Sequence, residues 1–314
     1  MLQRSPRNKT LCCTEADTRT YAQHIQYLNE AVAPKAIEGR VMCGDLMKVA
    51  GYLPTGFIDL LILDPPYNLD KNFSGNVFKK QSDGDYRLWF DRVLSLLHPM
   101  LKPQATIYVC SDWRTSALIF PVLDKRWHVR NRITWARDKG RGAKSNWKNN
   151  AEDIWFCTRS REYYFNVDAV KVKRKVIAPY REQGVPKDWQ EEKNGCYRLT
   201  HPSNMWTDMT VPFWSMPENT EHPTQKPEKL MAKLILASSK KGDFVFDPFL
   251  GSGTTAVVAE KLGRRWAAMD INATYLCWAL KRLAMAKENK VIQGYQDGIF
   301  WERNTSLHQQ CSSH

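Results

Sequence analysis

The sequence predicts a doubly wound α/β fold with a mostly parallel sheet, and three observations support this fold class. Strands and helices alternate from residue 39 to residue 135. The run Phe57–Leu63 is almost continuously apolar, which is typical of a strand buried on both faces of a parallel sheet. The alternation returns after residue 222, where glycines open a helix that follows a short apolar strand. The chain of 314 residues is long enough for one large domain of this class.

The expected elements follow from hydrophobic periodicity. Strands are expected where short apolar runs end at turn residues: 39–43, 57–63, 105–110, 130–135, 151–157, 162–165, 244–246 and 265–269. The first of these strands ends at Gly44-Asp45. Apolar residues at helical spacing, such as Leu88, Trp89, Val93 and Leu97, predict helices. The expected helices are 21–32, 46–53, 86–97, 116–125, 227–238, 251–262 and 273–287.

Breaks in the alternation divide the chain into five segments. Residues 1–36 are polar and weakly patterned, so they are expected to be an N-terminal extension. Residues 37–170 and 218–290 read as two α/β parts of one domain. Between them, 171–217 contains Pro, Gly, Trp and many basic residues and predicts an inserted irregular region. Residues 291–314 are expected to be a C-terminal tail.

The charge balance favours a polyanionic partner. The chain has 46 Lys and Arg against 33 Asp and Glu, a formal net charge of +13. Nucleic acid is the first candidate for such a partner, and a merely basic soluble enzyme is the alternative. No apolar run reaches the roughly 18–20 residues of a membrane span, and the N-terminal residues lack the apolar centre of a secretory signal.

Cysteine usage predicts an intracellular protein without a metal site. The eight cysteines are scattered along the chain, and several fall inside apolar runs. They form no paired CxxC spacing that would indicate zinc, and a chain of this length does not need disulfides for stability. We therefore expect a reduced protein that binds no metal.

The strongest chemical motif is Asp64-Pro65-Pro66-Tyr67, which follows the buried strand 57–63. Ligands of open α/β sheets bind outside the carboxyl ends of the strands. Consecutive prolines stiffen the backbone and donate no N–H, so their carbonyls can face outward. An aspartate and a proline carbonyl offer two acceptors to the two hydrogens of an exocyclic amine, and a tyrosine ring can stack on a planar base. A plain Pro-Pro turn after a core strand is the alternative interpretation.

The second motif runs from Asp247 to Thr255 and reads DPFLGSGTT. Its glycines allow close approach of a ligand to the backbone, and the helix that follows offers free N–H groups. The motif is neither G-x-G-x-x-G nor a P-loop, because Ala256 replaces the third glycine and no Lys-Ser/Thr follows Gly253. Asp270 ends the next expected strand, where an acid can accept hydrogen bonds from ribose hydroxyls, although a helix N-cap is the alternative for this residue.

These two motifs, together with His222-Pro223-Thr224-Gln225-Lys226-Pro227 between them, resemble the amino-methyltransferases that modify DNA. The order is the proline motif first, a variable insert next and the glycine loop last, which resembles the beta-class, circularly permuted group. The resemblance covers about residues 38–290 and implies a Rossmann-like class I methyltransferase fold. The halves 37–170 and 218–290 would then hold the catalytic motif and the cofactor loop, with 171–217 as the target-recognition region.

The resemblance also implies roles for individual residues. Asp64 would accept a hydrogen of the target amine with help from the Pro65 carbonyl, Pro66 would complete the rigid turn, and Tyr67 would stack on a flipped base. S-adenosylmethionine would be held by Asp45, His222, Thr224, Lys226, Asp247, Phe249, Gly251, Ser252, Gly253, Thr254 and Asp270.

Within that set, the resemblance places Phe249, Gly251 and Gly253 on the methionine side of the cofactor, with Thr224 and Lys226 near its carboxylate. Asp45 would face the adenine amine and Asp270 the ribose, although the family commonly has Glu where this chain has Asp270. For Asp247 and His222, a structural role in fixing the turn is an equal alternative.

Contact with DNA is expected from the basic segment 137–150, which reads RDKGRGAKSNWKNN, and from the insert 171–217. The candidate phosphate contacts are Arg137, Lys139, Arg141, Lys144 and Lys148. Solvated basic loops are the alternative for any single lysine. Four tryptophans could pack under the insert or enter the duplex, and packing is the expectation: Trp147, Trp189, Trp206 and Trp214.

The resemblance implies methylation of the N6 amine of adenine in double-stranded DNA, with the base flipped out of the duplex. The alternatives are N4-cytosine methylation, an RNA or protein-glutamine methyltransferase, and a non-catalytic DNA-binding module. The family places such a protein in the cytoplasm, associated with the nucleoid of a prokaryote or with a phage. A homodimer and a cognate restriction endonuclease are partners that the sequence leaves open.

Overall fold

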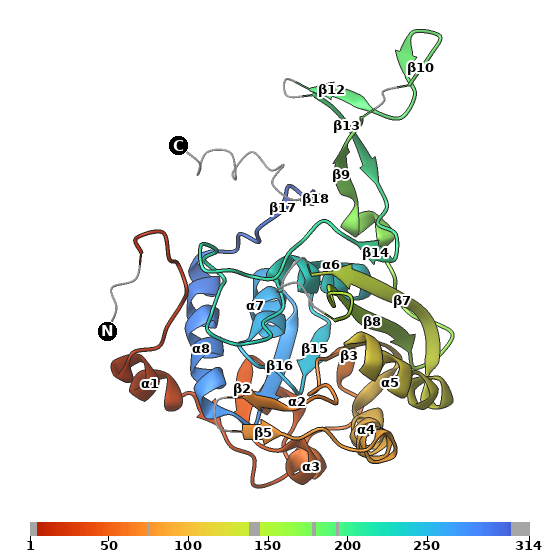
Figure 1. Ribbon diagram of the computed structural model, residues 1–314. Coiled ribbons are helices and arrows are strands. Elements are labelled where there is room, and N and C mark those ends of the chain that lie inside the picture. The colour runs from red at the N-terminus through yellow and green to blue at the C-terminus, as the bar shows by residue number, and fades with distance from the viewer. Residues whose placement is uncertain (1–4, 74–75, 138–144, 178–179, 193–194, 303–314) are drawn as a thin grey trace.

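The main sheet has nine strands in the described part of the chain, and it is mostly parallel (Figure 1). The computed structural model describes residues 5–73, 76–137, 145–177, 180–192 and 195–302. The strand order is β1 (Ile25–Gln26), β2 (Arg40–Cys43), β16 (Arg265–Asp270), β15 (Phe244–Asp247), β3 (Ile58–Leu63), β6 (Leu101–Ser111), β8 (Ala151–Thr158), β7 (His128–Ala136) and β14 (Met205–Trp206). Neighbours pair in parallel except at β8, which runs antiparallel to β6 and β7. The predicted doubly wound fold is confirmed.

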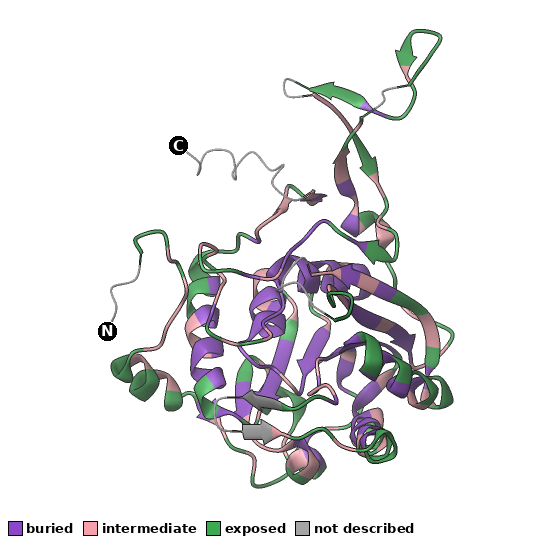
Figure 2. Cartoon of the chain, viewed as in Figure 1, coloured by how far each residue is buried: buried purple, intermediate pink, exposed green. Residues whose placement is uncertain are grey.

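Helices cover both faces of this sheet, and the core lies in two layers (Figure 2). Alternate residues of β3 enter the two layers: Leu60 and Ile62 belong to one, and Leu61 and Leu63 belong to the other. The first layer includes α6 (Glu228–Ser238), α7 (Thr254–Lys261) and α8 (Ala273–Glu288). The second includes α3 (Leu46–Val49), α4 (Asp83–Leu97) and α5 (Trp113–Arg126). Burial on both faces explains why the β3 sequence is continuously apolar.

Polar side chains fix where several helices begin. Ser82, Asp112 and Asn272 accept backbone N–H bonds at the starts of α4, α5 and α8. Thr14 and Asp17 form a capping box on α1 (Glu15–Ala22). The boundaries of α4, α5 and α8 lie within three residues of those that hydrophobic periodicity predicts, whereas α1 lies mostly outside the expected range.

Two expectations about the termini need correction. The helix expected at 21–32 is replaced by α1 and by β1, and Lys281 of α8 binds Asp17 at 2.8 Å, so the N-terminal segment packs along the domain. Residues 295–301 of the expected tail form β17 (Tyr295–Gln296) and β18 (Ile299–Trp301). Both segments are ordered by contacts to residues far away in sequence, which local periodicity cannot reveal.

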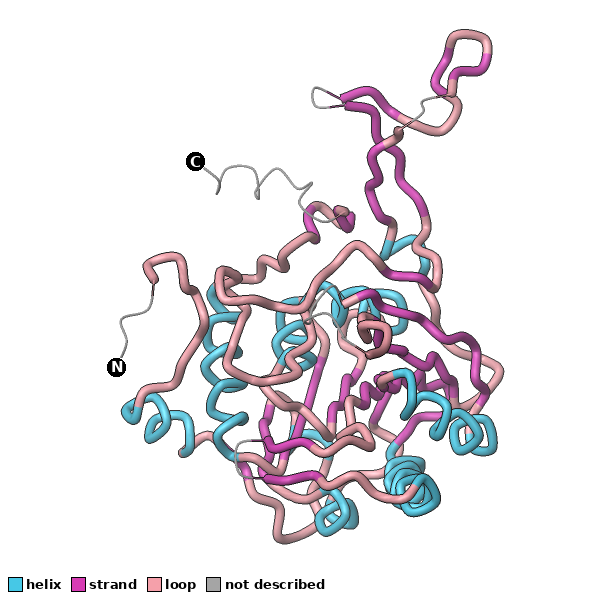
Figure 3. Tube along the Cα trace, in the orientation of Figure 1, coloured by secondary structure: helices cyan, strands magenta, loops and turns pink. Residues whose placement is uncertain are grey.

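The inserted region is a second, projecting sheet, not the irregular segment that its composition suggests (Figure 3). The order of its strands is β12 (Gln190–Glu192), β13 (Gly195–Thr200), β9 (Val172–Lys175), β18 and β17, and a hairpin of β10 (Arg181–Glu182) and β11 (Val185–Pro186) extends from it. Its strands are largely exposed or half-buried. Because the sheet buries little apolar surface, its strands lack the hydrophobic alternation that would have predicted them.

The remaining elements are short. They are α2 (Pro34–Ile37), β4 (Lys71–Phe73), β5 (Asn76–Phe78), and the 3₁₀ turns at Ala50–Tyr52, His98–Met100 and Val167–Val170. The strand expected at 162–165 is a loop, because β8 has β6 and β7 as partners on its two edges. In the described residues, no helix combines the length and apolar character needed to cross a membrane.

Candidate active site

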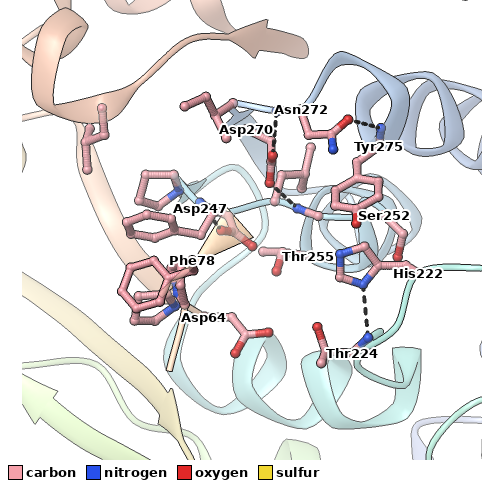
Figure 4. Close-up of a pocket in the computed structure, with 18 of the residues that line it drawn as sticks. Asp64, Phe78, His222, Thr224, Asp247, Ser252, Thr255, Asp270, Asn272 and Tyr275 are labelled. Carbon is pink, nitrogen blue, oxygen red and sulfur yellow. Dashed lines mark hydrogen bonds between the residues drawn. The ribbon is translucent and has the colours of Figure 1, made fainter. Parts of the chain in front are cut away.

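A cavity of about 400 Å³ opens at the carboxyl ends of the central strands (Figure 4). Each of four neighbouring strands brings one aspartate to it, either at its last residue or just after it. These residues are Asp45 after β2, Asp64 after β3, Asp247 in β15 and Asp270 in β16. Parallel strands place their carboxyl ends at one edge of a sheet, so the fold itself assembles these acids.

Glycines shape the turn between β15 and α7. Gly253 has a φ of +94°, and a Cβ on it would lie 2.6 Å from the Cβ of Ala279 in α8. Gly251 has a φ of +55°, and a Cβ there would lie 3.0 Å from Nε2 of His222. Side chains are therefore excluded at both positions by conformation and by space. The turn keeps its backbone exposed to the cavity, since Gly251, Ser252 and Thr254 line it.

Asp270 ties this turn to the neighbouring strand. Its Oδ2 accepts a hydrogen bond from Gly251 N at 2.8 Å, and its Oδ1 accepts one from Asn272 N at 2.8 Å. Burial raises the pKa of this carboxyl, and the backbone hydrogen bonds oppose the rise. Asn272, not Asp270, is the N-cap of α8. Asp270 lines the cavity, and a carboxylate keeps further acceptor sites after two bonds, so a ligand hydroxyl in the cavity can bond to it.

Asp247 and Asp45 have different local roles at the same cavity. Asp247 accepts the Phe249 N–H at 2.9 Å, and burial raises its pKa to about 7. Asp45 caps α3 by accepting the Met47 N–H at 3.0 Å. Both side chains line the cavity as well as fixing local backbone. The structural alternative for Asp247 is therefore present, and the expected ligand contacts of both residues stay predictions.

His222 and Thr224 form the opposite wall. The His222 ring lies against Tyr275 with ring centroids 4.5 Å apart, and its Nδ1 accepts the Thr224 N–H at 3.4 Å. Figure 4 shows both side chains pointing toward the cavity across from Asp247 and Asp270. Phe78, Trp89 and Phe249 add an aromatic side to the same space, with Trp89 and Phe249 centroids 6.4 Å apart.

Asp64 lies in a compact cluster of charged and polar groups. Its Oδ1 accepts the Tyr67 hydroxyl at 2.9 Å, and its Oδ2 accepts the Lys226 ammonium at 2.7 Å. The same ammonium lies 3.2 Å from Glu152 Oε2, and the Tyr67 hydroxyl lies 3.1 Å from that oxygen. The turn is further held by Tyr86, whose hydroxyl donates to the Pro66 carbonyl at 2.9 Å. In the described part of the chain, no donor is bonded to the Pro65 carbonyl.

Burial and charge determine the protonation of this cluster. Burial disfavours the Lys226 ammonium, but Asp64 and Glu152 outweigh that cost and hold the Lys226 pKa above its ordinary value. Burial, followed by the charges of Asp64 and Glu152, raises the pKa of Tyr67 well above its ordinary value. Lys226 is therefore a cation and Tyr67 a neutral hydroxyl across the neutral pH range.

The expected DNA contacts are only partly described. Arg137 and Lys148 lie at the two ends of the basic segment, whereas Lys139, Arg141 and Lys144 lie outside the described residues. Arg137 binds Glu152 Oε1 at 2.7 Å, and Lys148 is exposed. Packing is confirmed for Trp189 and Trp206, which are buried. Trp147 is 94% exposed and Trp214 is 50% exposed, so the expectation of packing is wrong for these two residues.

Sequence reasoning missed Glu152 and Arg282. Glu152 is buried in β8, and an acid at the start of an apolar strand was the available signal. Arg282 of α8 is buried, donates to the Ser252 carbonyl at 2.9 Å, and pairs with Glu228 at 3.0 Å beneath the glycine turn. Among the described residues, no group of three or more His, Cys, Asp or Glu side chains is placed to hold a metal ion.

A comparison with protein families shows to which family this chain belongs. The model of the N6_N4_Mtase family, described as DNA methylase, matches residues 58–281. The chain belongs to this DNA methylase family. The DNA adenine methyltransferase YhdJ of Escherichia coli (strain K12) is 32% identical to it over 275 residues, covering 85% of this chain and 88% of YhdJ.

Solved structures share the fold of this methylase. The M1.HpyAVI–SAM complex has a TM-score of 0.53 and 20% identity, covering 77% of this chain and 98% of that one. The cytosine-N4-specific PvuII DNA methyltransferase has a TM-score of 0.57 and 17% identity, covering 83% of this chain and 93% of that one. At these identities the likeness extends to the doubly wound methyltransferase fold, which is the fold class expected from the sequence.

Proposed function

We propose that this methylase transfers a methyl group from S-adenosylmethionine to the N6 amine of adenine in double-stranded DNA. The observation that carries the proposal is the position of Asp64 and the Pro65 carbonyl beside the 400 Å³ cavity at the strand ends. Those two acceptors suit the two hydrogens of an exocyclic amine. The similarity to YhdJ, a named DNA adenine methyltransferase, favours adenine over cytosine.

The cavity has the chemistry that the methyl donor requires. Asp270 and Asp45 offer carboxylate acceptors for ribose hydroxyls and the adenine amine of the donor, and Phe249 offers an apolar surface. The turn that contains Gly251, Ser252 and Gly253 would face the methionine portion, and His222, Thr224 and Asp247 would complete the wall. These residues fit the group because Gly251 and His222 both line the cavity, and a Cβ on Gly251 would take up the space between them, 3.0 Å from His222 Nε2.

The protein side of the reaction is positioning and electrostatics. When bound, S-adenosylmethionine supplies an electrophilic methyl group whose bond to sulfur breaks with its electron pair on sulfur. The conjugated amine is a poor nucleophile, and hydrogen bonds to Asp64 and the Pro65 carbonyl favour a pyramidal nitrogen with an available lone pair. Asp64 also lies where the proton lost from the methylated nitrogen can be accepted. Tyr67 would contact the flipped base with its ring while its hydroxyl holds Asp64.

The chain order and the projecting sheet complete the proposal. The strand before Asp64, β3, precedes β15 and the glycine turn in the chain although the two strands are neighbours in the sheet, as in the circularly permuted beta class. We propose that the sheet of β9, β12 and β13 reads the DNA, together with the basic segment that Arg137 and Lys148 flank. Base flipping would then deliver the target to Asp64 at a cost of a few kcal/mol in unstacking.

Analysis of the methylated nucleoside tests this function. The purified protein is incubated with labelled S-adenosylmethionine and mixed-sequence duplex DNA, and the digested nucleosides are separated. We expect the label in N6-methyladenine. Label in N4-methylcytosine would correct the target base, and transfer to RNA or protein in place of DNA would overturn the proposal.

A further inference from the structure

A row of alternating charges connects the half-exposed Arg137 to Asp64. Arg137 Nη1 lies 2.7 Å from Glu152 Oε1, Glu152 Oε2 lies 3.2 Å from Lys226 Nζ, and Lys226 Nζ lies 2.7 Å from Asp64 Oδ2. The side chains of Glu152 and Lys226 are each 4% exposed, whereas those of Arg137 and Asp64 are 27% and 19% exposed. The buried pair therefore separates two more accessible ends.

The buried pair also stands between two cavities. A second cavity of about 420 Å³ is lined by Trp135, Arg137, Glu152, Phe213 and Trp214. It shares four lining residues with the first: His222, Thr224, Gln225 and Lys226. Asp64 faces only the first of these cavities, and Glu152 faces only the second. Lys226 faces both, so its ammonium lies between one carboxylate at each cavity, 2.7 Å from Asp64 and 3.2 Å from Glu152.

Two donors compete with the target amine for Asp64. Lys226 bonds to Oδ2 and Tyr67 to Oδ1, so both carboxylate oxygens already accept a hydrogen. Glu152 Oε2 is within reach of the same two donors, at 3.2 Å from the ammonium and 3.1 Å from the hydroxyl. The tyrosine hydroxyl has one hydrogen, and bonding it to Glu152 leaves Asp64 Oδ1 available.

We propose that Glu152 is a positioning residue that draws Lys226 and the Tyr67 hydroxyl toward itself and so frees Asp64 to accept the target amine. The inference rests on the proposed function and extends it to a residue outside the three motifs. Arg137 fixes Glu152 through its other oxygen, which leaves Oε2 aimed at the two donors. Without the Glu152 charge, both donors would remain on Asp64, and the amine would find fewer and weaker acceptor sites on that carboxylate.

The variant Glu152→Gln tests this role, because it keeps the shape of the side chain and removes its charge. We expect the single-turnover rate of methyl transfer to fall about 10- to 100-fold, as for the loss of a charged hydrogen bond. The dissociation constant of S-adenosylmethionine should change less than about threefold, because Glu152 does not line the cofactor cavity. Asp153→Asn is the matched control, since Asp153 is the next residue of β8 and binds Thr134 at 2.9 Å.

A second pair of variants separates positioning from a structural role. Glu152→Asp keeps the charge, so it should recover part of the rate that Glu152→Gln loses. In a Lys226→Met background, Glu152→Gln should cost little further rate, because the main competing donor is gone. Costs that multiply in the double variant, or a Glu152→Asp rate no better than that of Glu152→Gln, would overturn the inference.

The wild-type protein separates this inference from the proposed function. A wild-type protein that transfers no methyl group to DNA contradicts the proposed function, and the inference fails with it. A wild-type protein that methylates DNA, together with a Glu152→Gln variant of unchanged single-turnover rate, contradicts the positioning role alone. If Glu152→Gln does not fold, as thermal unfolding would show, Glu152→Asp is compared with wild type and with Asp153→Asn. We expect Glu152→Asp to transfer the methyl group more slowly than both, because its shorter side chain holds the two donors less closely. A Glu152→Asp rate equal to that of the wild type overturns the role.

Discussion

The dipeptide Asp-Pro stands at the carboxyl ends of two neighbouring strands, β3 and β15, but the two aspartates have different contacts. Asp64 follows β3 and contacts the Lys226 ammonium at 2.7 Å. Asp247 ends β15, is buried, and accepts a backbone N–H from Phe249 at 2.9 Å, with its pKa raised to about 7. One carboxylate therefore has a cationic partner, and the other has a pKa near physiological pH, so it is partly protonated there.

The turns after these aspartates differ in the same way. Pro65 and Pro66 make a stiff turn with few donors, while Gly251 and Gly253 make a turn that exposes backbone to the cavity. Paired acids in contrasting environments are a common way to divide tasks within one site. On the proposed function, amine chemistry would belong to the Asp64 turn and donor binding to the Asp247 turn.

Three variants test this comparison before Asp64 itself is changed, and filling the glycine turn is expected to have the largest effect of the three. Gly253→Ala places a Cβ 2.6 Å from Ala279 at a φ of +94°, so the turn must shift. We expect S-adenosylmethionine affinity to fall at least tenfold and the free energy of unfolding to fall by about 1–3 kcal/mol. Gly242→Ala is the control, because Gly242 has a φ of +85° with nothing within 4 Å of the added Cβ. Equal donor affinity in both variants, measured by calorimetry, would show that the turn does not hold the donor.

The raised pKa of Asp247 makes a prediction about stability and pH. Its pKa rises from 3.8 to about 7 on folding, so the folded state binds a proton that the unfolded chain has released. Between about pH 4 and 7, this group lowers the free energy of unfolding as pH rises, by at most about 1.4 kcal/mol per pH unit. Asp247→Asn should remove that contribution.

Urea unfolding of the wild type and Asp247→Asn across this pH range measures the effect. Burial also raises the pKa of Glu218 to about 7, but Glu218 is present in both proteins, so the difference between their curves isolates Asp247. We expect the difference to change between about pH 4 and 7 and to level off above. Parallel curves would mean that Asp247 is ionised in the folded protein, and the contrast with Asp64 would disappear.

The smallest effect concerns Lys148 of the basic segment 137–150, where DNA is proposed to bind. Lys148→Gln should weaken duplex binding a few-fold across sequences and reduce the slope of log affinity against log salt by about 1. Lys35→Gln is the control, because Lys35 lies in α2 before β2, at the amino ends of the strands, and pairs with Glu38. An equal salt slope for both variants in a fluorescence titration would remove Lys148 from the DNA surface.

The sequence was sufficient to predict the doubly wound fold because local patterns determine it. Strand β3 is apolar on both faces, and each of the four aspartates lies at or just after a strand end, so topology alone brings them to one edge. The expectation that Lys226 is close to the cofactor carboxylate depended on family resemblance. The structure places the Lys226 ammonium on Asp64 and Glu152, and the roles of the individual site residues stay predictions.

The features that sequence reasoning missed depend on pairing between distant residues. β9 pairs with β18 through Val172 and Phe300, and no local periodicity links these positions. Glu152 acquires its meaning from Arg137 and Lys226, which lie on other elements. Arg282 reaches Ser252 from α8 for the same reason. Long-range contacts of this kind are invisible to a reading of spacing along one segment.

The central claim is that the Asp64 turn performs the chemistry and the Asp247 turn binds the donor. The most direct test measures S-adenosylmethionine affinity and single-turnover methyl transfer on the same Asp64→Ala protein. We predict donor affinity close to that of the wild type and a transfer rate reduced about 100-fold or more. An Asp64→Ala protein that turns over at the wild-type rate would contradict the claim, and so would one whose loss of activity is explained by loss of donor binding.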